Sequence, residues 1–250
     1  MKIKKPDIID LTLVIYILCA IVASNGSFVM KLGRLLLVVV FMLTLIQKRG
    51  RLIRNQYVYW LMIFWFWATL SIAWAANQNI AKAMSKTLAV NAICMYALMY
   101  LINFRYERID IVLRTCIVAP ILLEVRVIIS GGLFAFLNSR ALDDISANTV
   151  GLVAAFGACI AISYWIPKRE KRITYGLMAI MNFLVVILSS SRKALLCVAI
   201  PIFFLFVFYH RDNFWKIMLK VCVAVVGLWV GYYLIIHIPA LYNTVGHRIE

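Results

Sequence analysis

Acidic residues are scarce in this chain: 10 Asp and Glu stand against 26 Lys and Arg, which gives a formal net charge of +16. Charged residues of both signs make up only 14% of the sequence, whereas apolar residues make up 65% and the mean hydropathy is +0.94. Such a composition cannot cover the surface of a water-soluble domain, so that class is excluded. The chain is predicted to be a polytopic membrane protein.

Several chemical signatures are also missing. The absence of a glycine-rich GxxxxGK loop argues against ATP-driven transport by this chain. There is no CxxC pair, and the three histidines, His210, His237 and His247, are too scattered to suggest a metal site. The cysteines all fall within apolar runs and are interpreted as packing residues: Cys19, Cys94, Cys116, Cys159, Cys197 and Cys222.

Long apolar runs separated by clusters of charge predict an all-α fold, a transmembrane helical bundle forming one integral membrane domain over 1–250. The runs lack the alternating polarity of transmembrane strands and approach the roughly 20 residues that a helix needs to cross a bilayer. We expect about nine spans, at 8–23, 29–46, 57–75, 87–104, 109–129, 149–166, 173–189, 194–209 and 217–236.

The loop cations predict the orientation. Placing the N-terminus in the cytoplasm puts most Lys and Arg residues inside and the C-terminus outside, as the positive-inside rule requires. The high net charge then reflects topology, which argues against nucleic-acid binding, and the inside cations need no further role. The first segment, 1–23, is interpreted as an uncleaved span.

The cations predicted outside are unexpected and therefore informative. Ser189 to Lys193 interrupts an apolar stretch, so hydroxyls and two cations meet where one span ends and the next begins. A second polar segment, 130–148, runs into another apolar helix that Asn148 or Ser146 can cap, adding positive potential at its start. An anchoring role for the helix end is the plainer alternative. The pattern favours a site for the diphosphate of a polyprenyl lipid, with these candidate ligands: Arg126, Arg140, Ser191, Arg192 and Lys193.

Charges within the fifth predicted span add one constraint. Arg114 and Arg126 are separated by only about 18 Å of helix, less than the roughly 30 Å of a hydrocarbon core, so at least one snorkels or faces a polar cavity. Glu124 is two positions from Arg126 and cannot face it on one helix, so any cationic partner of Glu124 lies elsewhere.

Four segments together resemble a known family. They are NSRALDDISANTVGLVAAFGA (138–158), PKREKR (167–172), LSSSRKALL (188–196) and YNTVGHRIE (242–250). Within them, the Ser-Arg-x-Ala-Leu-Leu segment and the Arg-x(7)-Asn-x-x-Gly segment, from Arg140 to Gly151, are the closest matches. These features are similar to those of the O-antigen ligase and polysaccharide polymerase superfamily, of the WaaL and Wzy type.

The resemblance implies a metal-independent, cofactor-free glycosyltransferase of the bacterial cytoplasmic (inner) membrane. Its members transfer a glycan from undecaprenyl diphosphate to an acceptor hydroxyl at the outer face, during O-antigen, lipopolysaccharide, capsule or exopolysaccharide synthesis. Arg192 and Arg140 match arginines that hold the donor diphosphate. The Ser-Arg-Lys-Ala-Leu-Leu form favours a polymerase over a ligase. By the same analogy, the partners are the lipid-linked glycan, membrane lipid, a flippase and a chain-length regulator.

The chain departs from the family after Glu250, where members continue into a large outer loop and further spans. We therefore expect the chain to be the N-terminal part of a longer architecture or a shortened member. The catalytic base is unknown, with His237 and His247 as substitutes and the Asp143–Asp144 pair as a solvated alternative. A lipid-linked oligosaccharide transporter and a non-catalytic assembly protein remain alternative functions.

Overall fold

The computed structural model describes residues 7–23, 27–47, 56–103, 105–131, 141–142, 145–166, 172–189 and 191–208, together with 216, 218–219, 222–223, 226, 229, 233 and 237. Arg140, Asp143, Asp144, His247 and Arg248 lie outside the described residues. Most of the ninth predicted span, 217–236, lies outside them as well.

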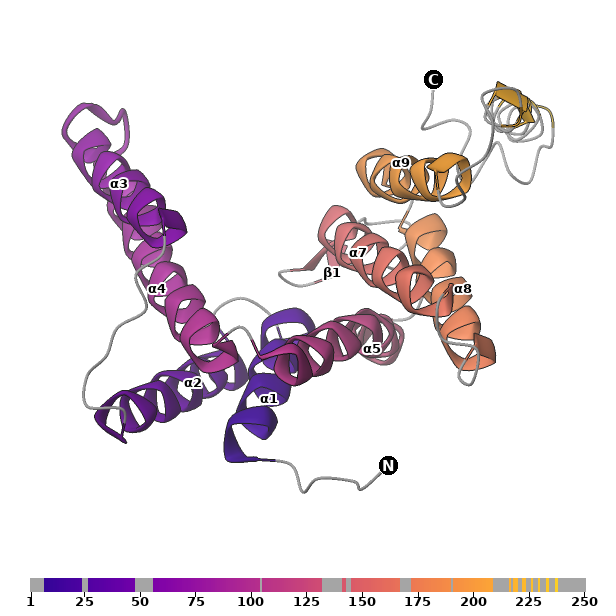
Figure 1. The fold of residues 1–250 in the computed structure, drawn as a ribbon. Coiled ribbons are helices and arrows are strands. Elements are labelled where there is room, and N and C mark those ends of the chain that lie inside the picture. The colour runs from indigo at the N-terminus through magenta and orange to yellow at the C-terminus, as the bar shows by residue number, and fades with distance from the viewer. Residues whose placement is uncertain are drawn as a thin grey trace. The chain divides into compact units, whose positions relative to one another are not determined.

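The regular elements of the described residues are helices, apart from one hairpin whose two strands have two residues each (Figure 1). This confirms the all-α expectation. The helices before the hairpin are α1 (Ile8–Val22), α2 (Phe28–Gln47), α3 (Gln56–Leu70), the 3-10 turn η1 (Ser71–Trp74), α4 (Gln78–Ile102) and α5 (Tyr106–Gly131). The hairpin pairs β1 (Ala141–Leu142) with β2 (Ile145–Ser146), and α7 (Ala147–Trp165), α8 (Arg172–Leu188) and α9 (Arg192–Phe208) follow.

Most of these helices coincide with the predicted spans to within a few residues, but α4 does not. The span was expected to begin at 87, whereas the helix begins at Gln78. Asn77 caps it, because its side-chain oxygen accepts a hydrogen bond from the backbone N–H of Ile80 at 3.1 Å. Lys82 and Lys86, which resemble loop cations in the sequence, therefore extend from the first turns of a longer helix.

Within the described residues, three helices are long and apolar enough to cross a membrane: α2, α4 and α7. The apolar helices α1, α8 and α9 and the stretch Val58–Trp74 are shorter. Helix α5 has 26 residues, but Arg114, Glu124 and Arg126 lower the apolar character of its central part. The structure thus supports the membrane class of the chain.

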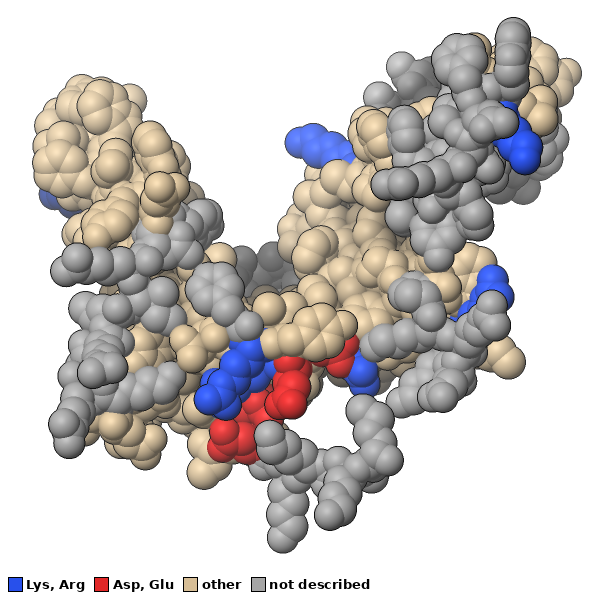
Figure 2. Space-filling view, viewed as in Figure 1, with Lys and Arg blue, Asp and Glu red and all other residues tan. Residues whose placement is uncertain are grey.

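The helix surfaces carry few charged side chains over wide areas, as the tan faces of Figure 2 show, and many large apolar side chains are exposed on them. Helix α3 is the clearest case, because Trp60, Phe64 and Trp67 are each more than half exposed. Large exposed apolar patches are rare on soluble monomers and typical of surfaces that meet lipid or another protein. A hydrocarbon environment is the one in which such a helix needs no polar face.

Contacts divide the chain within α5 into two compact units, Met1–Val112 and Leu113–Glu250. In the first unit, α1, α2 and α4 enclose a core that contains Leu13, Leu37 and Leu101. Phe41 packs edge-on against Tyr100 with 5.1 Å between ring centroids. Gly33 lets α2 approach α1 closely, since a side chain there would meet the Cβ of Cys19 at 2.8 Å.

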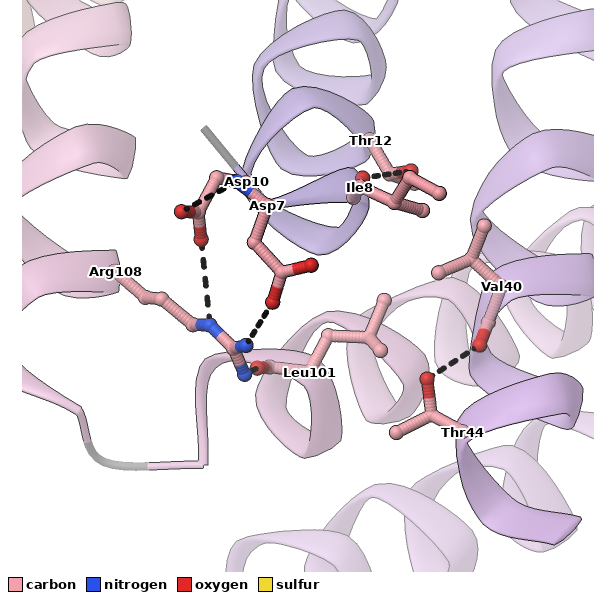
Figure 3. A network of polar contacts seen from close by, with 8 residues as sticks. All are labelled: Asp7, Ile8, Asp10, Thr12, Val40, Thr44, Leu101 and Arg108. Carbon is pink, nitrogen blue, oxygen red and sulfur yellow. Dashed lines mark hydrogen bonds and ion pairs between the residues drawn. The ribbon is translucent and has the colours of Figure 1, made fainter. Parts of the chain in front are cut away.

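Arg108 ties the first unit together at one end (Figure 3). Its buried guanidinium donates to the carbonyl of Leu101 at 2.5 Å and pairs with Asp7 at 3.2 Å and with Asp10 at 3.3 Å. The expectation that inside cations serve only orientation is therefore wrong for Arg108. Arg108 joins the start of α5 to the start of α1 and to the last turn of α4. Its neighbour Arg105 is exposed to solvent.

In the second unit, α7 lies against both α8 and α9. Helix α5 meets α7 where Pro120 interrupts the hydrogen bonding of α5, leaving the carbonyl of Cys116 without its usual helical donor. Gly157 faces that carbonyl, because a Cβ at this position would lie 3.0 Å from it. The fully buried Asn182 of α8 donates to the carbonyl of Ile117 at 3.0 Å and so links α8 to α5.

Replacing Arg108 with Ala should lower the free energy of unfolding by about 1–3 kcal/mol, because the buried carbonyl of Leu101 loses its side-chain donor. Arg105→Ala is the matched control, since it removes an exposed cation three residues away and should change stability by less than about 0.5 kcal/mol. Thermal unfolding of the purified protein in detergent measures both changes. Equal effects of the two substitutions would contradict the structural role of Arg108.

Candidate functional site

The first half of the candidate site is the beginning of α7. Ser146 is its N-cap, because the Ser146 hydroxyl accepts a hydrogen bond from the backbone N–H of Thr149 at 3.3 Å. The hairpin fixes this residue, since Ser146 pairs with Ala141, which follows Arg140 in the sequence. Of the two predicted caps, Ser146 is therefore the one that is used. The prediction that Asn148 caps the helix is therefore wrong. Asn148 is an exposed residue of the first turn, where it can still shape a site.

The second half is the turn between α8 and α9. Ser191 precedes α9, and its hydroxyl accepts from the backbone N–H of Ala194 at 3.4 Å, which is the arrangement of an N-cap. Ser189 ends α8 by donating to the carbonyl of Val186 at 2.7 Å. Both serines are buried, so their hydroxyl contacts first serve to terminate one helix and start the next.

Gly151 joins the two halves. A Cβ at this position would collide with the Oγ of Ser189 and would lie 3.0 Å from the Cβ of Ala194. The first turns of α7 therefore lie directly against the α8–α9 turn and the first turn of α9. As a result, the N-terminal ends of α7 and α9 are neighbours, a relation that the sequence analysis did not predict.

Neighbouring helix N-termini have a definite electrostatic consequence. Each carries a partial positive charge of about half an elementary charge and backbone N–H groups that lack helical acceptors. The exposed Lys193 adds a full charge in the first turn of α9, and Arg192 is the first residue of that helix. In the described residues of this region, positive charge is thus concentrated without an acidic side chain in the first turn of either helix. Such an arrangement favours an anion, above all one with several oxygen acceptors.

The remaining predicted ligands are less closely defined. Arg126 is half-buried on α5, whose close approach to α7 is at Gly157, in the middle of α7. Arg140 lies outside the described residues, and nothing is described of the side chain of Arg192. Their roles as ligands of a diphosphate stay predictions.

Two further groups, Glu124 and His237, have side chains that can accept a proton. Glu124 is buried on α5, and neither of its carboxylate oxygens has a hydrogen-bond partner among the described residues. His237 is exposed, its ring stacks on Tyr233 with 3.9 Å between centroids, and its Nδ1 lies 2.9 Å from the carbonyl of Tyr233. The sequence predicts only an ion-pairing role for Glu124; a carboxyl group within a predicted membrane span is the signal that marks it as unusual.

Comparison of the chain with protein-family models, with curated proteins and with solved structures finds no match.

Substituting Gly151 by Ala should separate the two helix starts and destabilise the protein by about 1–3 kcal/mol, the usual cost of overpacking. Ser189→Gly in the same chain removes the side-chain atom that the new methyl group meets most closely and should recover part of the loss. A double-mutant cycle on thermal unfolding measures this coupling. Additive effects of Gly151→Ala and Ser189→Gly would show that the two residues are not in contact.

Glu124→Leu should raise the free energy of unfolding by about 1–3 kcal/mol, because it replaces a buried carboxyl group that has no hydrogen-bond partner in the described structure. Lys82→Gln, which removes an exposed charge of α4, is the control and should change stability by less than about 0.5 kcal/mol. Thermal unfolding measures both. A lower midpoint for Glu124→Leu would indicate that the carboxylate has a stabilising partner.

Proposed function

We propose that this chain is a membrane-embedded glycan polymerase that transfers undecaprenyl-diphosphate-linked repeat units at the outer face of the bacterial cytoplasmic membrane. The observation that carries the proposal is the junction of the α7 and α9 N-termini at Gly151, with Lys193 exposed and Arg192 heading α9. Because this junction collects backbone donors and cationic residues, it suits a diphosphate better than a neutral sugar.

The topology belongs to the same proposal. Nine spans, with the N-terminus in the cytoplasm and the C-terminus outside, place the α8–α9 turn and the start of α7 on the outer face. The lipid tail of the donor would then remain in the bilayer while its diphosphate lies at the membrane surface. This placement is supported by the apolar surfaces of the helices and by the excess of loop cations on the inner side.

The proposed reaction is a substitution at the anomeric carbon of the donor glycan. The acceptor hydroxyl forms a new C–O bond, the bond to the diphosphate breaks, and the electron pair leaves with the diphosphate. Arg192, Arg140 and Lys193 would stabilise the charge that grows on this leaving group. The hydroxyl proton passes to a base, so all bonds and charges of the transfer are accounted for without a metal or a nucleotide sugar.

An O-antigen ligase uses the same donor and would need the same anion site, so the two transferases differ in acceptor. A ligase transfers the finished glycan to a lipid or protein acceptor, whereas a polymerase extends the glycan.

A transporter would instead need cations within an interior cavity, and Arg114, the best candidate for that place, is exposed on α5. A non-catalytic assembly protein would not depend on the anion site.

Arg192→Ala, expressed in a host that lacks the native gene, should abolish long surface glycans and leave single repeat units on the lipid carrier. Loss of charge-assisted contacts to a phosphate costs about 1.5–3 kcal/mol, or roughly a 10- to 100-fold fall in transfer rate. Arg192→Lys should recover part of the activity, because it keeps the charge but not the bidentate fork. Gel analysis of surface glycan and mass spectrometry of lipid-linked intermediates measure the outcome.

Lys216→Ala is the control for this experiment, since Lys216 is an exposed cation predicted on the cytoplasmic side. It should leave the glycan profile unchanged at equal membrane levels. Long chains retained on undecaprenyl diphosphate after deletion would identify a ligase. Normal glycan with Arg192→Ala at wild-type levels would contradict the anion site.

A further inference from the structure

A second feature of the Leu113–Glu250 unit lies toward the other end of α7. The C-terminal half of α7, the first three turns of α8 and one residue of α9 line an open groove of about 580 Å³. The groove is almost entirely apolar, with Ala158, Ile162, Leu177, Ile180, Phe183 and Ile202 among its lining residues. Ala158 lies seven residues beyond Gly151, about 10 Å along α7, so the groove is separate from the candidate anion site.

One end of this groove carries a fixed cation. The guanidinium of Arg172 lies over the ring of Trp165, 5.0 Å from its centroid, and both residues line the groove. Gly176 allows this arrangement, because a Cβ there would lie 3.3 Å from the indole Nε1 of Trp165. A cation–π contact of this kind restricts the arginine while leaving its N–H donors available at the edge of the ring.

The combination of an apolar groove and a cation at its end fits an amphiphile. We propose that the groove binds an anionic phospholipid, with its phosphate on Arg172 and one acyl chain along α8. The distance along α8 from Arg172 to Phe183 is about 16 Å, close to half of a hydrocarbon core of about 30 Å. A single chain from one leaflet therefore matches the length of the groove.

Charge complementarity supports this occupant. Arg172 is the last residue of the segment PKREKR, which contains four cations and one acid, and we place this segment on the cytoplasmic side. Basic pockets between transmembrane helices on that side are suited to the headgroups of anionic lipids. A second copy of the chain docked in the groove would cover Arg172 with apolar surface, at a cost in desolvation that a phosphate avoids.

The inference rests on the membrane placement of α7 and α8 and is independent of the glycan chemistry. Its test uses the full chain purified in detergent and mixed with phosphatidylglycerol or phosphatidylcholine of identical acyl chains. Native mass spectrometry should show at least a fivefold preference for phosphatidylglycerol, as expected for one cation near the headgroup. Equal retention of the two lipids would overturn the proposal.

Variants of the groove distinguish recognition of the lipid headgroup from binding of the acyl chain. Arg172→Gln should remove the preference for phosphatidylglycerol, Arg172→Lys should keep it, and Leu177→Trp should lower retention of both lipids by filling the groove. Lys82→Gln, which removes an exposed cation of α4, should leave the preference unchanged. A preference that survives Arg172→Gln would overturn the assignment. A dimer that Leu177→Trp dissociates, with no bound lipid, would identify a second copy as the occupant instead.

Discussion

The absence of a side chain at Gly151 is the constraint on which the candidate site depends. It lets the first turns of α7 lie against Ser189 and Ala194, so that two helix N-termini become neighbours. The hydroxyl of Ser189 terminates α8, and that of Ser191, which the sequence suggests as a ligand, begins α9. Positive potential at the site therefore comes first from the backbone, and the cationic side chains are added to a surface that already favours anions.

Buried polar side chains elsewhere in the structure also bond to the backbone. In an apolar bundle each buried polar group needs a partner, and the N–H groups of the Arg108 guanidinium and of the Asn182 amide find one in the carbonyls of Leu101 and Ile117. Each bond connects two different helices, so these polar side chains hold neighbouring helices together as well as satisfying buried carbonyl groups. The carboxylate oxygens of Glu124 lack such partners among the described residues, as does the Oδ1 of Asn182.

The helices were largely predictable because hydrophobic length is a strong signal. The expected spans at 29–46 and 109–129 correspond to α2 (Phe28–Gln47) and α5 (Tyr106–Gly131). The start of α4 was missed because its first turns carry lysines, and Arg108 was misjudged because its acidic partners lie about 100 residues away in the sequence. For the site, local sequence predicted the polar turn and offered Ser146 as one of two possible N-caps of the helix that follows segment 130–148. The role of Gly151 required the structure, since no pattern within α7 specifies which turn it meets.

The central claim is that the starts of α7 and α9 lie together at the outer membrane face. The most direct test introduces Asn148→Cys and Lys193→Cys into a chain whose six native cysteines are replaced, and treats intact spheroplasts with membrane-impermeant thiol reagents. The account predicts that both positions react from outside and that a short bifunctional reagent joins them within one chain. Reaction only after the membrane is opened, or reaction at both positions without cross-linking, would contradict it.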